Sequence, residues 1–209
     1  MTLRRLGQSE IEIAPLVLGT NVVGWTADEK TSFAIFDAFV AEGFSAIDTA
    51  DSYSRWVPGN DSESEKIIGR WLKERGNRDK VHIFTKVGSD MGQGKKDLSA
   101  KWIEQEVEAS LKRLQTDYID LYQSHWPDPT VTHEETLSAY DRLIKAGKVR
   151  YTGASNYDAD LLSEALTVSR EKALPRYETL QNEYNLYTRD KFEGAIQELV
   201  LREGLSLIP

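Results

Sequence analysis

The sequence predicts an α/β fold in which short buried strands alternate with amphipathic helices. Three observations support this prediction. Short apolar segments rich in Ile, Val, Leu and Tyr recur along the chain. Between them, apolar residues recur at the three- and four-residue spacing of a helix. No Gly/Ser-rich linker or change in composition divides the 209 residues, so we expect a single domain over residues 1–209.

The first expected elements are a hairpin, a strand and a helix. Residues 3–13 alternate apolar and polar side chains around Gly7-Gln8-Ser9, which predicts an N-terminal β-hairpin. A buried strand is expected at residues 16–18. Thr26 and Glu29 have the spacing of a capping box, which predicts the start of a helix that stops at Gly43.

The same alternation continues through the rest of the chain. Ser62 and Glu65, and then Thr132 and Glu135, form two further predicted capping boxes, each at the start of a helix. The expected strands cover residues 46–48, 81–85, 118–122, 149–153, 179–183 and 205–208. The other expected helices cover residues 99–114, 158–171 and about 192–204. These elements make about six βα units and a seventh strand.

Two architectures fit this element order: a doubly wound open sheet and a (β/α)8 TIM barrel. An open dinucleotide-binding sheet is expected to carry a GxGxxG motif after its first strand, and residues 19–24, Gly-Thr-Asn-Val-Val-Gly, do not match it. In a barrel, the carboxyl ends of all strands converge on one face. The sequence favours the barrel because polar side chains follow its strands.

These polar side chains form a predicted ring at the mouth of the barrel. One or more stands at or just beyond the end of each of four strands, and another lies within a fifth strand; they are Asp48, Tyr53, Lys86, His125, Ser155, Asn156 and Gln181. Far apart in sequence, they converge only if the sheet closes on itself.

The residue types in this ring predict proton transfer to a carbonyl oxygen. A tyrosine has an ordinary pKa of about 10, and a nearby ammonium such as that of Lys86 lowers the pKa of a phenol. Asp48 is positioned to hold Lys86 by an ion pair, and His125 to hydrogen-bond the substrate oxygen. The ring contains no electron source, so a hydride must come from a cofactor, whose carboxamide would find partners in Ser155, Asn156 and Gln181.

Five ordered segments of the chain resemble the aldo-keto reductases, in particular the bacterial type related to the potassium-channel β subunits. They cover residues 43–53 (GFSAIDTADSY), 84–86 (FTK), 117–125 (DYIDLYQSH), 147–157 (GKVRYTGASNY) and 181–185 (QNEYN). The resemblance implies that Tyr53 is the general acid, that Asp48 and Lys86 tune it, and that His125 orients the carbonyl.

The resemblance also implies a cofactor and a substrate class. The expected cofactor is NADP, used as NADPH to reduce an aldehyde or ketone. Its expected binding residues are Gly19, Thr20, Asn21, Asp48, Ser155, Asn156 and Gln181. Two alternatives remain: an NADP-sensing regulatory protein that acts through a partner, and an inactive fragment of the reductase. The resemblance further leads us to expect a chain that is C-terminally truncated, since the family has an eighth barrel strand after the seventh.

Aromatic and histidine side chains near the ring allow further predictions. Trp56 and Trp126 follow strand ends, so we expect them to form walls of the substrate pocket. His82 and His133 are expected to be structural or surface groups. We predict no metal site, since only one histidine follows a strand and Lys86 would repel a cation.

Composition limits the function classes. A net charge of −8 argues against a general nucleic-acid surface. The absence of cysteine excludes disulfides and a cysteine nucleophile. No segment has the length and apolar character of a signal peptide or a membrane span, so we expect a cytoplasmic protein with a small-molecule carbonyl substrate and no membrane partner. The sequence does not predict the oligomeric state.

Overall fold

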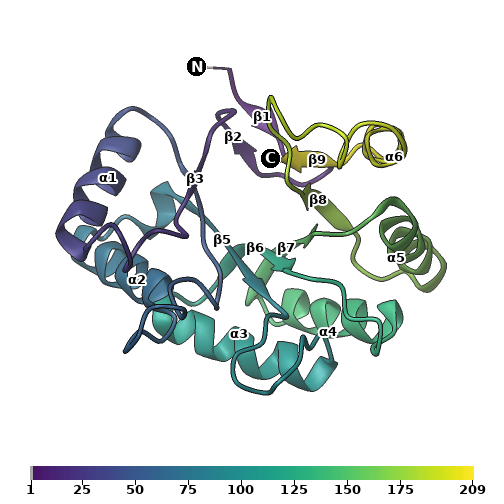
Figure 1. Cartoon of the computed structure of the whole chain (residues 1–209), viewed down its shortest axis with the longest axis horizontal. Helices are drawn as coiled ribbons and strands as arrows, with labels where there is room; N and C mark the ends of the chain where they lie inside the picture. The colour runs from purple at the N-terminus through teal and green to yellow at the C-terminus, as the bar shows by residue number, and fades with distance from the viewer. Residues whose placement is uncertain (1) are drawn as a thin grey trace.

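The computed structural model describes residues 2–209 and contains a curved sheet of seven parallel strands in the order β3-β4-β5-β6-β7-β8-β9. Figure 1 shows the strands surrounded by helices, with β3 and β9 as the two edges of the nearly closed barrel. The strands span Val17–Gly19 (β3), Ala46–Asp48 (β4), His82–Val87 (β5), Ile119–Ser124 (β6), Val149–Ser155 (β7), Tyr177–Gln181 (β8) and Ser206–Ile208 (β9). The predicted (β/α)8 architecture, lacking its last strand, is confirmed.

Six α-helices connect successive strands and cover the outside of the sheet (Figure 1). They span Glu29–Ala41 (α1), Glu63–Arg75 (α2), Ala100–Leu114 (α3), His133–Lys145 (α4), Ala159–Lys172 (α5) and Ala195–Glu203 (α6). Their apolar faces pack on the outward side chains of the strands in one large core that includes Ile47, Ile83 and Tyr122. Neighbouring helices also touch one another, because each follows a strand adjacent to the last.

The N-terminal hairpin closes the bottom of the barrel. Its strands, β1 (Arg4–Arg5) and β2 (Glu12–Ile13), are antiparallel and have two residues each. Leu6, Ile11 and Ile13 belong to a second core cluster with inward-facing residues of the barrel strands. The hairpin also contacts the last strand, since the amide of Gly7 donates to the Ser206 hydroxyl at 2.9 Å.

The interior of the barrel changes from apolar to polar along the strands. Successive side chains of a strand point to opposite faces, so residues two apart share the interior. Phe84 is in the bottom cluster and Lys86 lies one step above it; Leu121 and Gln123 repeat this order on β6. The sheet register pairs Lys86 with Gln123 and Ser155 with Gln181. Polar groups from β5, β6, β7 and β8 are therefore brought to one end of the barrel.

The helix caps agree only partly with the predicted capping boxes. Asp28, rather than Thr26, caps α1 by accepting from the amide of Thr31 at 2.8 Å. Ser62 precedes α2 in a left-handed conformation and its side chain makes no cap hydrogen bond, and the Glu65 carboxylate accepts from the Thr85 hydroxyl instead. Thr132 does cap α4, accepting from the amide of Glu135 at 3.2 Å. The first prediction was wrong because α1 begins at Glu29 with Asp28 as its N-cap, and the second because Ser62 has a left-handed backbone and makes no cap hydrogen bond.

No helix within residues 2–209 is long and apolar enough to cross a membrane.

Candidate active site

The ammonium of Lys86 lies at the centre of the polar end of the barrel. It donates to the Asp48 carboxylate at 2.6 Å, to the carbonyl oxygen of Thr49 at 2.8 Å and to the Tyr53 hydroxyl at 2.9 Å. Lys86 is 1% exposed, and these contacts satisfy its three N–H donors. Burial lowers the pKa of Lys86, but the nearby Asp48 carboxylate and Tyr53 more than compensate, so its pKa is raised overall. Lys86 is therefore a permanently charged group fixed beneath Tyr53.

The Asp48 carboxylate is held from three sides. Besides Lys86, it accepts from the amide of Gln123 at 3.0 Å and from the amide of Gln181 at 3.2 Å. Asp48 is 3% exposed, and a buried carboxylate is stabilised only by such charged and hydrogen-bonded partners. Strands β4, β5, β6 and β8 are thus joined at one carboxylate.

The phenol of Tyr53 points its oxygen at Lys86. Because the Lys86 ammonium donates to that oxygen, the hydroxyl hydrogen is free to point toward a ligand. The effect of the ammonium predicted from the sequence is a lowered pKa of this phenol. Instead, burial raises the pKa of Tyr53, and the opposing attraction of Lys86 does not overcome it. Tyr53 is consequently a protonated acid at neutral pH.

His125 faces Tyr53 across the site. The two ring centroids are 5.9 Å apart, with the planes at 76°. Burial, followed by the charges of Lys86 and Lys96, lowers the pKa of His125 to about 3, so the imidazole is neutral at physiological pH. Its Nδ1 is 3.0 Å from the Ser89 hydroxyl, which orients the ring. The structure thus brings together all four residues predicted to be catalytic.

The chain matches the sequence model described as the aldo/keto reductase family over residues 15–209. The chain belongs to the aldo/keto reductase family. Its resemblance to that family was predicted from five motifs, and the match is now shown for nearly the whole chain.

Relatives of this aldo/keto reductase chain occur in bacteria and fungi. Aldo-keto reductase YhdN of Bacillus subtilis is 38% identical over 197 residues, which cover 91% of this chain and 56% of the relative. Protein tas of Escherichia coli is 34% identical over 232 residues, covering 100% of this chain and 67% of the relative. Aryl-alcohol dehydrogenase (NADP(+)) of Phanerodontia chrysosporium is 31% identical, covering 95% of this chain and 55% of the relative. The chain spans about half to two thirds of the length of these relatives.

The predicted nicotinamide residues lie together at the ends of β7 and β8. The Ser155 hydroxyl donates to the main-chain oxygen of Gln181 at 2.8 Å, and the Asn156 amide donates to the main-chain oxygen of His125 at 2.9 Å. Asn156 has a φ of 60°, a conformation that asparagine tolerates better than most residues. The side-chain oxygens of Asn156 and Gln181 accept no hydrogen bond from residues 2–209. They fit the NH2 group of a carboxamide, and the residues present therefore fit a nicotinamide.

The other predicted cofactor residues lie at the end of β3. Gly19 pairs with Asp48 in the sheet and lines a cavity of about 430 Å³ together with Asp48 and Gln181. Asn21 is exposed nearby. The Thr20 hydroxyl is buried and is used within the protein, donating to the main-chain oxygen of Asp48 at 2.8 Å and contacting Ser64 at 2.9 Å. Gly19 and Asn21 are therefore open to a ligand, whereas the side chain of Thr20 supports the fold.

The two predicted wall residues flank Tyr53 and His125. Trp56 lies edge-on to Tyr53, with ring centroids 6.4 Å apart, and Trp126 stacks on His125 at 5.7 Å. Trp56 is 52% exposed. Large flat side chains thus border the site on both sides of the phenol.

Gln123 and Ser89 contact predicted catalytic residues but are not among the residues predicted from the sequence. Gln123 lies two residues before His125 on a strand with inward-facing Leu121, so the period of two along a strand would have placed it in the interior. Ser89 lies in the loop after β5, where no periodicity applies. Its contact with His125 depends on the path of that loop.

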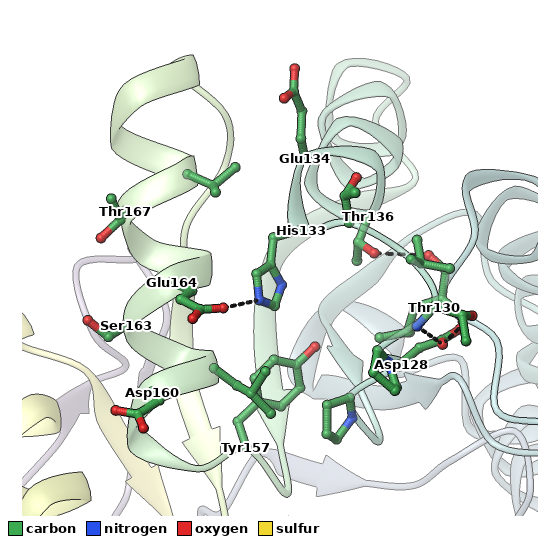
Figure 2. Close-up of a pocket in the computed structure, with 17 residues that line it drawn as sticks. Asp128, Thr130, His133, Glu134, Thr136, Tyr157, Asp160, Ser163, Glu164 and Thr167 are labelled. Atoms are coloured by element: carbon green, nitrogen blue, oxygen red, sulfur yellow. Dashed lines mark hydrogen bonds and ion pairs between the residues drawn. The ribbon is translucent and has the colours of Figure 1, made fainter.

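A larger cavity lies elsewhere, between α4 and α5. It has a volume of about 1010 Å³, and its lining residues include His133 and Glu164, whose side chains are 3.9 Å apart (Figure 2). The buried carboxylate on its wall, Asp128, is already bonded to Leu98 and Thr130. None of the four predicted catalytic residues lines this cavity. Within residues 2–209, no three His, Asp or Glu side chains form a cluster able to hold a metal ion.

Proposed function

We propose that this protein is an NADPH-dependent oxidoreductase that reduces aldehydes or ketones to alcohols, with Tyr53 as the general acid. The observation that carries this proposal is the buried Lys86 ammonium, which bonds Asp48 at 2.6 Å and Tyr53 at 2.9 Å. A cation fixed beside a phenol stabilises the phenolate that remains after the proton has left.

The proton path follows from these contacts. The Tyr53 hydroxyl gives its proton to the carbonyl oxygen, and the negative charge left on the phenol oxygen is met by Lys86. Asp48 keeps Lys86 charged and in place, because without it burial would favour the neutral amine. Asp48 therefore acts through Lys86 and does not itself meet the substrate.

His125 supplies a neutral hydrogen-bond donor. With its pKa lowered to about 3, the imidazole carries one ring proton at neutral pH. The Ser89 hydroxyl at 3.0 Å from Nδ1 accounts for one ring nitrogen and leaves the other for the substrate oxygen. The carbonyl oxygen is thus polarised by His125 while it receives the proton from Tyr53.

NADPH, when bound, supplies the hydride. We place its carboxamide at Ser155, Asn156 and Gln181, since these side chains lie together at the barrel mouth and two of their oxygens are free of partners within residues 2–209. We place the adjoining part of the cofactor near Gly19 and Asn21. The name of the Phanerodontia chrysosporium relative, which includes NADP, supports the choice of NADP over NAD.

The substitution Tyr53→Phe tests this proposal. Removing the hydroxyl takes away the proton donor and leaves the ring, so we expect kcat for benzaldehyde reduction to fall by a factor of about 10² to 10⁴. NADPH affinity, measured by fluorescence titration, is expected to stay nearly unchanged. Tyr187→Phe is a matched control, because Tyr187 is 96% exposed. Turnover of the Tyr53→Phe variant at the parent rate would show that Tyr53 is not the acid.

A further inference from the structure

Five aromatic rings form a continuous row along the candidate active site. Trp25 lies edge-on to Trp56 at 5.7 Å, Trp56 to Tyr53 at 6.4 Å, and Tyr53 to His125 at 5.9 Å; His125 stacks on Trp126 at 5.7 Å. We call these residues the aromatic row. The proton donor is at its centre, and the rings come from three separate loops at the barrel mouth. A flat substrate at Tyr53 would therefore extend along indole faces or edges.

A cation closes one end of the aromatic row. The ammonium of Lys96 lies 4.2 Å from the centroid of the Trp126 ring. Such a cation–π contact gives a long, exposed side chain a preferred position. Lys96 also contributes to lowering the pKa of His125, so its charge reaches the site.

The charge of Lys96 is not neutralised by a carboxylate. Its neighbour Lys95 forms an ion pair with Asp97 at 3.3 Å, whereas no Asp or Glu of residues 2–209 lies within ion-pair distance of Lys96. The other lysine near the phenol, Lys86, is already bonded to Asp48. Lys96 is thus the ammonium beside His125 that remains available to an anion, in a protein whose net charge is −8.

We propose that Lys96 on Trp126 forms a carboxylate subsite, and that preferred substrates are aromatic carbonyl compounds bearing a carboxylate on the ring side away from the reacting carbonyl. This inference rests on the proposed reductase function. The aromatic row binds the ring, Tyr53 and His125 bind the carbonyl oxygen, and Lys96 binds the carboxylate. Without the carboxylate, a substrate still binds the row but gains nothing from Lys96.

The kinetic test compares 4-carboxybenzaldehyde with its methyl ester. Lys96→Met is expected to lower kcat/KM for the acid about threefold to fivefold more than kcat/KM for the ester, the range typical of a partly exposed ion pair. Lys96→Arg is expected to retain the preference. Added NaCl is expected to reduce the preference of the parent protein but not that of Lys96→Met, because salt screens an exposed charge. Lys95→Met removes the same net charge and is expected to change kcat/KM for neither substrate.

A binding experiment tests the same carboxylate subsite without turnover. The full chain is titrated with 4-carboxybenzyl alcohol and with benzyl alcohol, and the indole N–H signals are followed by NMR. Lys96→Met is expected to weaken the binding of only the carboxylated alcohol, by about threefold to fivefold. Equal effects of Lys96→Met and Lys95→Met, equal effects on both alcohols, or no binding of the carboxylated alcohol would overturn the proposal. Selective binding with no reduction of either aldehyde would overturn the reductase function and leave the carboxylate subsite supported.

Discussion

At the scale of single residues, Asp51 is the least expected group near the site. It lies three residues after Asp48 and two before Tyr53, is fully buried, and neither of its carboxylate oxygens has a hydrogen-bond partner within residues 2–209. Burial, followed by repulsion from Glu65 and Glu106, raises the pKa of Asp51 well above its usual value. Asp51 is therefore a neutral carboxylic acid in the folded protein.

The substitution Asp51→Asn tests this protonation state. The pKa of Asp51 is raised in the folded protein, whereas in the unfolded chain this carboxyl loses its proton above about pH 3.9. Ionisation in the unfolded chain favours unfolding, so the parent becomes less stable as the pH rises from that value toward the raised pKa. Asn cannot ionise. We expect the Asp51→Asn variant to become more stable relative to the parent as the pH rises from 4 to 8. Urea unfolding at the two pH values measures this.

The matched control for that measurement is Asp190→Asn, since Asp190 is exposed. The Asp190→Asn variant is expected to show the same change in the free energy of unfolding between the two pH values as the parent. If the stability of Asp51→Asn relative to the parent did not rise between pH 4 and pH 8, Asp51 would not keep its proton in the folded state.

Asp48, Lys86 and His125 could be predicted at this scale because each stands at or just after the end of a strand. Their separation in sequence does not matter once parallel strands share one mouth. The pKa of Tyr53 could not be predicted in the same way. Its direction depends on how deeply the phenol is buried against how near Lys86 lies, and neither quantity is visible in a sequence.

At the scale of elements, a buried ion cluster joins α2, α3 and β5. Arg113 bonds Glu65 at 2.6 Å and also contacts Glu106, while Glu65 accepts from the Thr85 hydroxyl at 2.6 Å. Thr85 precedes Lys86, so this cluster supports the strand that carries the central ammonium. Glu65 is fully buried and Glu106 nearly so.

The substitution Arg113→Met tests how much this cluster contributes to the free energy of unfolding. Removing the guanidinium leaves two buried carboxylates without their cation, which typically costs about 3–5 kcal/mol. We expect a loss of that size in urea unfolding. Arg142→Met is the control, because its pair with Glu104 is exposed and is expected to contribute about 0–1 kcal/mol. Similar losses for the two variants would mean that the Arg113 cluster contributes no more than a surface pair.

The element order was predictable from the sequence, but some details were not. Helical spacing and short apolar segments are local signals, and they predicted the order of strands and helices that the structure shows. The capping boxes at Thr26 and Ser62 failed because capping depends on where the helix begins and on which partners the side chains find in three dimensions. Glu65 had the right spacing, yet its partners are Thr85 and Arg113.

At the scale of the whole molecule, one end of the barrel is apolar and the other carries the polar groups of the candidate active site. The hairpin and an apolar layer with Phe84 and Leu121 fill one end, and the layer with Lys86 and Gln123 carries the polar groups at the other. This division follows from the period of two along each strand combined with parallel strand directions. A single domain over residues 1–209 remains a prediction.

The most direct test of the central claim is deuterium transfer. The full chain is incubated with benzaldehyde and NADPH that carries deuterium at the transferable position of the nicotinamide, and the product is examined by mass spectrometry. A carbonyl reductase gives benzyl alcohol that carries one deuterium on the carbon of the former carbonyl. Tight binding of NADPH with no deuterated alcohol would contradict the claim and would favour an NADP-binding regulatory protein instead.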